Sequence, residues 1–155
     1  MSLIVKLRQL EIKDEKNFEL SAEELELTNP RLKKRVKAHL DIFKGKDFVR
    51  VQGMVKTTII VTCSRCLEEV ELPIDEGFRL DYIMGMDPYV RMERVALKKE
   101  DIERIYFQGD SIDLGIGIRD TIILATPIAP LCKEACAGIC LKCGKNLNKG
   151  KCECK

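Results

Sequence analysis

Histidine, tryptophan and aromatic residues in general are scarce in this sequence, which has one histidine, no tryptophan and 5% aromatic residues. The single histidine, His39, lies on an expected strand, and no catalytic triad can be assembled around it. No glycine-rich phosphate loop follows a strand, and no pair of carboxylates stands out as general acid and base. We therefore expect a binding protein rather than an enzyme, without a small-molecule substrate.

Long hydrophobic runs are also absent. The N-terminal segment MSLIVKLRQL contains an apolar run of only three residues before Lys6, which is too short for the core of a signal peptide. No stretch approaches the roughly 18 apolar residues of a membrane span. These absences predict a cytoplasmic protein without a membrane partner.

The eight cysteines favour metal binding in such a compartment. Thiols stay reduced in the cytosol, where clustered cysteines bind metal more often than they form disulfides. A disulfide framework is the alternative, because the number is even and because the cytosol of a thermophile is an exception. A chain of 155 residues with 45% apolar content can bury a core of its own and needs no disulfides to fold.

The centre of the chain has the pattern of antiparallel strands. Residues 36–43 alternate apolar and polar side chains, and residues 48–62, beyond a turn, are rich in β-branched side chains. Residues 70–82 then run back as another strand. The pattern predicts a three-stranded meander that carries Cys63 and Cys66 at one tip.

The flanking segments are less regular. We expect a helix over residues 113–125, with Asp113 as its N-cap and Pro127 just beyond its end, although Gly115 and Gly117 weaken the pattern. The remaining expected elements are a short strand at 4–10, a strand or helical turn at 21–27, and a loop at 85–111 with a short helix at 98–105.

Together these elements predict an α+β fold. It consists of an antiparallel sheet of four to six strands, a meander that can curl towards a barrel, with one helix and a C-terminal cysteine-rich zinc knuckle. We expect a bulge at Gly53 and an edge or a bulge at Pro73, which lacks a backbone donor. The predicted organisation is a sheet domain over residues 1–131 and a zinc-knuckle tail over residues 132–155, packed on that domain.

The tail contains the spacing of a metal knuckle. Cys140 and Cys143 enclose two residues and precede Gly144, so that a tight turn can direct backbone amides at the sulfurs. A second pair follows after a short, turn-rich segment and completes a set of four thiolates. This set, the tail site, comprises Cys140, Cys143, Cys152 and Cys154.

The other four cysteines form a second candidate set, the tip site: Cys63, Cys66, Cys132 and Cys136. A metal bound there would tie the meander to the start of the tail. The alternative is a single metal, in the tail site, with the central pair left as structural thiols. We expect zinc, one or two ions, because four thiolates are typical of structural zinc; iron suits the same ligands.

Three other uses of these cysteines compete with structural zinc. The spacing from Cys136 to Cys143 is also that of radical enzymes with a four-iron cluster, but only 12 residues follow it and Lys142 replaces the usual aromatic residue. A rubredoxin-type iron site usually has aromatic rings around it, and none occurs after Phe107. A dithiol oxidoreductase would use Cys63 and Cys66 in a βαβ context, whereas the neighbouring segments indicate antiparallel strands.

The net charge of +2 conceals a segregated distribution. Residues 132–155 hold a net charge of +4, which leaves −2 on the rest of the chain, and residues 31–37 carry five positive charges. Lysine contacts with phosphates give affinity without sequence readout, and base stacking is not expected in a tail without aromatic residues. As a hypothesis, four tail lysines contact RNA phosphates or an acidic protein partner: Lys142, Lys145, Lys149 and Lys151.

Two blocks of the sequence resemble a known family. Residues 63–74 (CSRCLEEVELPI) and 130–155 (PLCKEACAGICLKCGKNLNKGKCECK) are similar to the signature blocks of the YceD-like proteins, called large ribosomal RNA subunit accumulation proteins. Residues 111–132 resemble the segment that leads into the tail, a helix in that family, where Gly115 and Gly117 are a departure. The resemblance covers about residues 48–155.

The resemblance implies a role in accumulation or processing of large-subunit ribosomal RNA. It implies a metal role for all eight cysteines and no catalytic residue. We therefore expect a non-enzymatic zinc-binding accessory factor whose partner is large-subunit ribosomal RNA, a pre-ribosomal particle or a ribosomal protein. The competing hypotheses are a thiol-based redox or metal sensor and a protein–protein adaptor for a ribosomal protein.

Overall fold

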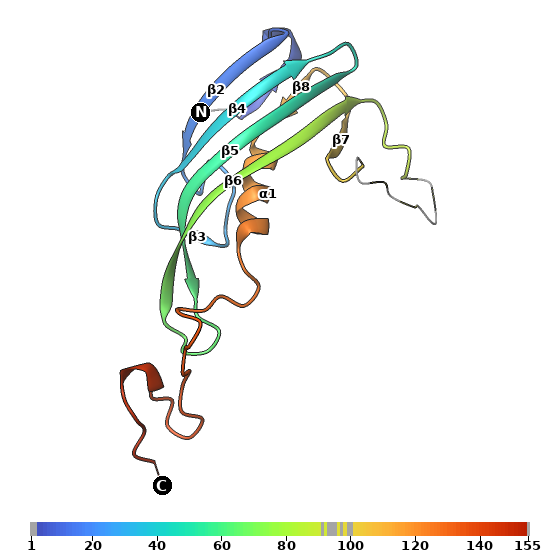
Figure 1. Cartoon of the computed structure of the whole chain (residues 1–155). Helices are drawn as coiled ribbons and strands as arrows, with labels where there is room; N and C mark the ends of the chain where they lie inside the picture. Colours follow the sequence, from blue (N-terminus) through green and yellow to red (C-terminus); the bar gives the residue numbers. More distant parts are fainter. Residues whose placement is uncertain (1–2, 91, 93–95, 97, 99–100, 155) are drawn as a thin grey trace.

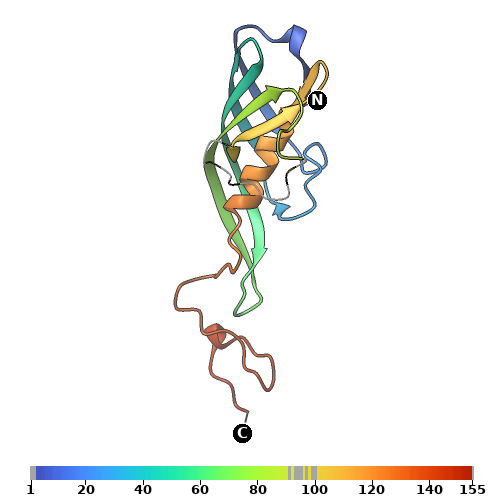
Figure 2. The ribbon, with the colours of Figure 1, turned by 90° about the vertical axis from the view of Figure 1, so that its right-hand side faces the viewer.

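The computed structural model describes residues 3–90, 92, 96, 98 and 101–154, and one long, curved sheet dominates them (Figure 1). Its strands lie in the order β2, β4, β5, β6, β7, while the short β3 pairs with β5, and β1 and β8 form a separate pair. Helix α1 lies against one face of the sheet (Figure 2). The elements are β1 (Ile4–Lys6), η1 (Leu7–Gln9), β2 (Lys13–Leu20), β3 (Arg31–Leu32), β4 (Val36–Lys44), β5 (Phe48–Thr62), β6 (Glu69–Met84), β7 (Arg104–Phe107), β8 (Ser111–Asp113), α1 (Gly115–Ala125) and η3 (Leu147–Lys149).

The predicted α+β class and its central meander are confirmed. β4, β5 and β6 pair antiparallel, and the β5–β6 register runs without interruption from Phe48 opposite Ile83 to Thr62 opposite Glu69. Successive side chains of a strand point to opposite faces, so every second residue of β4 and β5 is buried beneath α1 and the N-terminal segment. The centre of this core includes Leu20, Val36, Leu40, Val51, Val55, Ile59, Leu114, Ile118 and Ile122.

Helix α1 approaches the sheet closely around one aromatic ring. Phe78 stands opposite Gly53 in the β5–β6 register, and its ring lies against both Gly53 and Gly117 of the helix. A Cβ atom at either glycine would overlap the ring. The bulge expected at Gly53 is therefore wrong: the residue keeps regular register, and its missing side chain makes room for Phe78.

The helix expected at residues 113–125 is confirmed over Gly115–Ala125, but its cap differs. Leu114 is the N-cap residue, and Asp113 belongs to β8. The carboxylate of Asp113 nevertheless accepts a hydrogen bond from the backbone N–H of Gly115 at 2.8 Å. Asp113, the residue before the N-cap, thus satisfies one backbone donor of the first helical turn.

The sheet is mixed and open rather than wholly antiparallel. β7 lies inside the expected loop at 85–111 and runs parallel to β6, with Asp81 opposite Arg104. Within the described residues, β2 and β7 form the two edges, so the sheet does not close into a barrel. Because β7 reaches only the last four residues of β6, Pro73 lies where β6 has no described neighbour on that side, as expected for an edge position.

For three short segments the structure differs in part from the prediction or describes only part of the segment. The strand expected at residues 4–10 ends at Lys6 and gives way to a 3-10 turn, and residues 22–26 form turns. Residues 99 and 100 of the short helix expected at 98–105 lie outside the described residues, and Arg104 and Ile105 belong to β7.

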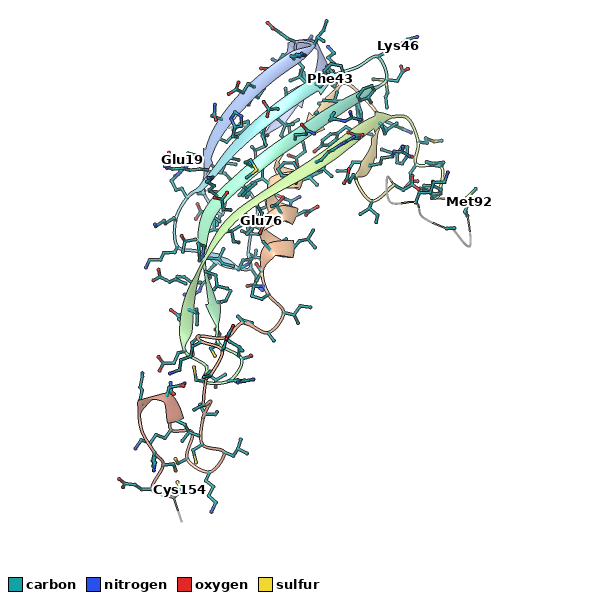
Figure 3. All side chains as sticks on the ribbon, viewed as in Figure 1. Glu19, Phe43, Lys46, Glu76, Met92 and Cys154 are labelled. Carbon is teal, nitrogen blue, oxygen red and sulfur yellow. The ribbon has the colours of Figure 1, made fainter. Side chains whose placement is uncertain are left out.

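The molecule is elongated, because β5 and β6 continue beyond the other strands as a long hairpin (Figures 1 and 2). The tail passes the tip of this hairpin and ends at the far end of the molecule, where Cys154 lies (Figure 3). Among the described residues, no helix is long and apolar enough to cross a membrane. The division into a domain at 1–131 and a tail at 132–155 stays a prediction.

Candidate metal centres

The tip site assembles at the end of the β5–β6 hairpin. The sulfurs of Cys63 and Cys136 lie 3.8 Å apart and those of Cys66 and Cys132 lie 3.6 Å apart, and all four sulfurs lie within 4.8 Å of one another. Cys63, Cys66 and Cys136 are buried, whereas Cys132 is exposed. The structure thus brings together the four cysteines expected for the second set, from positions as far as 73 residues apart.

Backbone hydrogen bonds fix the tip. The N–H of Cys63 donates to the carbonyl of Glu68, and the N–H of Leu67 donates back to the carbonyl of Cys63, at 2.8 and 3.0 Å. The segment after α1 docks on this turn through the N–H of Ser64, which donates to the carbonyl of Pro130 at 2.8 Å. This contact places the following residues, including Cys132, beside the hairpin.

The tail site assembles from local residues. The Cys152 sulfur lies 3.2 Å from that of Cys140 and 3.5 Å from that of Cys143, and Cys154 completes the group within 4.8 Å. The turn after Cys140 needs Gly144, whose φ of +73° favours glycine, and the N–H of Gly144 donates to the carbonyl of Cys140. Cys143 and Cys154 are exposed, so this site is more open than the tip site.

Both clusters have the dimensions of a single metal ion with four thiolate ligands. Zinc–sulfur bonds of about 2.3 Å in a tetrahedron separate the sulfurs by about 3.8 Å. The four sulfur–sulfur distances given above, 3.2–3.8 Å, are close to this value and far exceed the roughly 2.05 Å of a disulfide bond, and all sulfurs of each cluster lie within 4.8 Å of one another. Both sites could therefore hold a metal ion, and the ligand set alone suits zinc or iron.

The two knuckles stabilise thiolate charge in the same way. Backbone N–H groups of Cys66 and Arg65 point at the first sulfur of the tip knuckle and lower the pKa of Cys63 to about 6, against the opposing effect of burial. In the tail site, the N–H of Cys143, the neighbouring Cys152 thiol and the N–H of Lys142 lower the pKa of Cys140 to about 6. Each site thus contains at least one thiol that ionises readily, as a metal ligand must.

Two polar residues at the tip site, Asn148 and Arg65, were not predicted from the sequence. Asn148 donates from Nδ2 to the sulfur of Cys136 at 3.3 Å, and Arg65 donates from Nη1 to the carbonyls of Glu134 and Cys136. A local pattern such as C-x-x-C does not predict these hydrogen bonds, because their donors and acceptors lie up to 71 residues apart in the sequence.

The four lysines expected to contact a partner lie on the tail and are exposed. Lys149 forms an ion pair with Glu68 of the hairpin tip at 2.5 Å, and Lys145 donates from Nζ to the carbonyl of Lys151 at 3.0 Å. Lys149 therefore has a structural contact with the hairpin tip.

Elsewhere, several positive charges face carboxylates. In the basic segment at 31–37, Arg31 pairs with Glu69, Lys33 with Glu71 and Arg35 with Glu24. Across β5 and β6 on the open face, Arg50 and Lys56 likewise face the carboxylates of Asp81 and Asp75 at 2.7 and 2.9 Å. His39, as expected, has no place in either cluster; its Nδ1 lies 2.9 Å from Oδ1 of Asn17.

Comparison with known proteins gives a family match. Residues 51–155 match the family model described as "Large ribosomal RNA subunit accumulation protein YceD". Proteins named "Large ribosomal RNA subunit accumulation protein YCED homolog 1, chloroplastic" are similar in Arabidopsis thaliana, with 32% identity over 77% of this chain, and in Zea mays, with 29% identity over 84%. An uncharacterized protein of Mycobacterium leprae is 26% identical over 64% of this chain.

The chain spans about half the length of these relatives: 43% of the Arabidopsis protein, 52% of the maize protein and 43% of the mycobacterial one. No solved structure matches the chain.

Proposed function

Because this chain belongs to the YceD family of large ribosomal RNA subunit accumulation proteins, we propose that it is a non-enzymatic, zinc-binding accessory factor for the accumulation of large-subunit ribosomal RNA. The observation that carries the proposal is the pair of four-thiol clusters, which join the sheet to a lysine-rich tail. The names of the relatives support the ribosomal RNA role. Its partners, in this proposal, are large-subunit ribosomal RNA, a pre-ribosomal particle or one of its proteins.

Zinc is proposed as the metal because structural sites with four thiolates are characteristic of it. When bound, it supplies a rigid cross-link and no reaction step. The described residues after Pro130, 131–154, contain no regular strand or α-helix and only the short η3, so they depend on the two clusters to hold one shape. Cys63, Cys66, Cys132 and Cys136 would hold one ion, and Cys140, Cys143, Cys152 and Cys154 would hold another.

The proposed RNA contact lies on the tail. Its net charge of +4 is spread over a small, open surface, whereas the basic residues at 31–33 face carboxylates on β6. Contacts with phosphates need positive charge and little shape complementarity, so the tail is a better candidate than the basic residues at 31–33. The proposed contact residues are the four lysines expected there; Lys149 is left out of the test below because its ion pair with Glu68 also ties the tail to the hairpin tip.

Sedimentation of the tagged protein in cell lysate tests this proposal. We expect co-migration with large-subunit precursors at low salt and its loss at high salt, because lysine–phosphate contacts release counterions. Changing Lys142, Lys145 and Lys151 to Glu should abolish co-migration. Matched changes to Glu at Lys6, Lys13 and Lys46 should preserve it; these lysines are exposed, and Lys46 lies far from Cys154 (Figure 3).

Protein that stays at the top of the gradient in both salts would contradict stable particle binding. Nuclease treatment then separates RNA binding from the adaptor alternative: a contact with a ribosomal protein survives removal of RNA. The cytoplasmic location stays a prediction; two relatives are named as chloroplastic.

One observation favours the sensor alternative. Cys143 and Cys154 of the tail site are exposed, so an oxidant or alkylating reagent can reach them. A sensor requires that these thiols react while zinc is bound. Structural zinc requires that they react only after chelation, and we expect the second result.

A further inference from the structure

The two candidate metal centres are connected by contacts within the tail. The loop between the second and third ligands of the tail site folds back onto the segment that follows Cys136. Within this fold-back, Ile139 pairs with Asn146 as an isolated β-bridge, and the N–H of Leu147 donates to the carbonyl of Gly138 at 2.9 Å. The loop therefore touches the chain directly beside a ligand of the tip site.

The side chain of Asn148, at the centre of this loop, is held in one orientation. Its Oδ1 accepts the backbone N–H of Ala137 at 2.9 Å, which requires that the amide nitrogen point the other way. That nitrogen donates to Oδ1 of Asn146 at 3.0 Å and to the sulfur of Cys136 at 3.3 Å. Asn146 also accepts the backbone N–H of Asn148 at 2.9 Å, so it caps η3 and fixes the position of Asn148.

The contact joins a residue of one centre to a ligand of the other. Cys136 is only 5% exposed, so the donors to its sulfur come from the protein; they include the side chain of Asn148 and the backbone N–H of Gly138. A donor that points at a metal-bound thiolate stabilises its charge and orients the ligand, and outer-shell partners of this kind typically contribute roughly 10- to 100-fold to metal affinity.

We propose that Asn148 is a positioning residue that couples the two metal centres, so that zinc in the tail site strengthens zinc binding in the tip site. The proposal rests on the proposed zinc binding and concerns its regulation. Asn148 lies between Cys143 and Cys152, and a metal bound by these ligands fixes the loop that presents its amide to Cys136. Coupling of this kind is reciprocal: zinc in the tip site also strengthens binding in the tail site.

Titration of the full-length, reduced protein with Zn²⁺ against a competing chelator tests the coupling. Alkylation at each step, followed by mass spectrometry, reports the protection of each cysteine and thereby separates the two sites. Asn148→Ala should weaken the tip site roughly 10- to 100-fold. Asn148→Asp should weaken it at least as much, because a carboxylate still accepts from Ala137 but repels the thiolate. Lys133→Ala, an exposed change in the same tail, should leave it within about twofold of the original protein.

A second series separates coupling from a local packing effect. The double change Cys143→Ser and Cys154→Ser removes two ligands of the tail site and should weaken the tip site by a similar factor. Asn148→Ala added to this background should then have little further effect, because the loop is already unfixed. Effects that multiply instead would overturn the coupling.

Different results would contradict zinc binding and the coupling between the sites. A protein that binds no Zn²⁺ overturns both the zinc part of the proposed function and the coupling. A protein that binds two ions, with an unchanged tip site in Asn148→Asp, overturns the coupling alone. A merely structural role for Asn148 predicts this second result, because Asp retains the bond from Ala137.

Discussion

Replacement of Gly117 by alanine should destabilise the protein, although alanine is the better helix former. Gly117 lies inside α1, where alanine is favoured over glycine by about 0.8–1.0 kcal/mol. A Cβ atom there would enter the ring of Phe78, and Gly53 bounds the ring on its other side. Insertion of a methyl group into such a packed core costs about 1–3 kcal/mol. Because the ring cannot retreat towards β5, we expect the upper half of that range and a net loss of about 1–2 kcal/mol.

Urea unfolding at a fixed, saturating zinc concentration measures this loss as a lower midpoint with an unchanged slope. The zinc concentration must be held constant because bound metal contributes to apparent stability.

The same substitution in a Phe78→Leu background is the matched control. A leucine side chain removes the ring, so the helix preference of alanine should prevail and Gly117→Ala should become neutral or stabilising by up to about 1 kcal/mol. The effect of Gly117→Ala on the free energy of unfolding should therefore change sign when the Phe78 ring is removed. A Gly117→Ala protein that is more stable than the original with Phe78 in place would refute it.

Three further predictions concern the metal, a partly buried ion pair and a buried hydroxyl. Chelation of zinc should make all eight thiols reactive to alkylation, while circular dichroism retains the signature of the sheet, whose core lies apart from the clusters. Asp81→Asn should cost about 1 kcal/mol at neutral pH, because Arg50 donates to both carboxylate oxygens and lowers the pKa of Asp81. With a depressed folded pKa, this contribution is present above the unfolded pKa of about 3.9 and is lost as pH falls through the folded value, so the two proteins should converge in acid. Tyr82→Phe should cost about 1 kcal/mol in thermal unfolding, because the buried Tyr82 hydroxyl donates to the carbonyl of Asp113 at 2.5 Å.

The sheet was predictable where its pattern is local. In strands β4 and β5 every second side chain is buried over a long stretch, so the alternation of apolar residues in the sequence predicts which face is buried. The knuckles were predictable for a similar reason, since Cys140 and Cys143 can grip one ion with only a turn between them.

Apart from the tip site, whose four cysteines were expected as a set, the contacts between distant segments were not predictable. Gly53 suggested a bulge and Gly117 a weak helix, because sequence alone does not show that the Phe78 ring occupies the space between them. β7 was missed because its four residues are too few for a periodic pattern and because parallel pairing with β6 depends on the path of the intervening chain. The contact of Asn148 with Cys136 likewise requires the fold of the tail.

The position of the tip site explains why the long hairpin matters for the proposed function. Its ligands lie up to 73 residues apart, so a metal there closes a long loop and removes more freedom from the unfolded chain than the local tail site does. Cys63 and Cys66 lie in the turn between β5 and β6, and this hairpin extends beyond α1 (Figure 1). A metal in the tip site would thus hold the tail lysines relative to the sheet, together with the ion pair between Lys149 and Glu68. Loss of Cys63 should therefore impair RNA binding even though no RNA contact is assigned to that residue, whereas loss of Lys142 should impair binding with both metal sites intact.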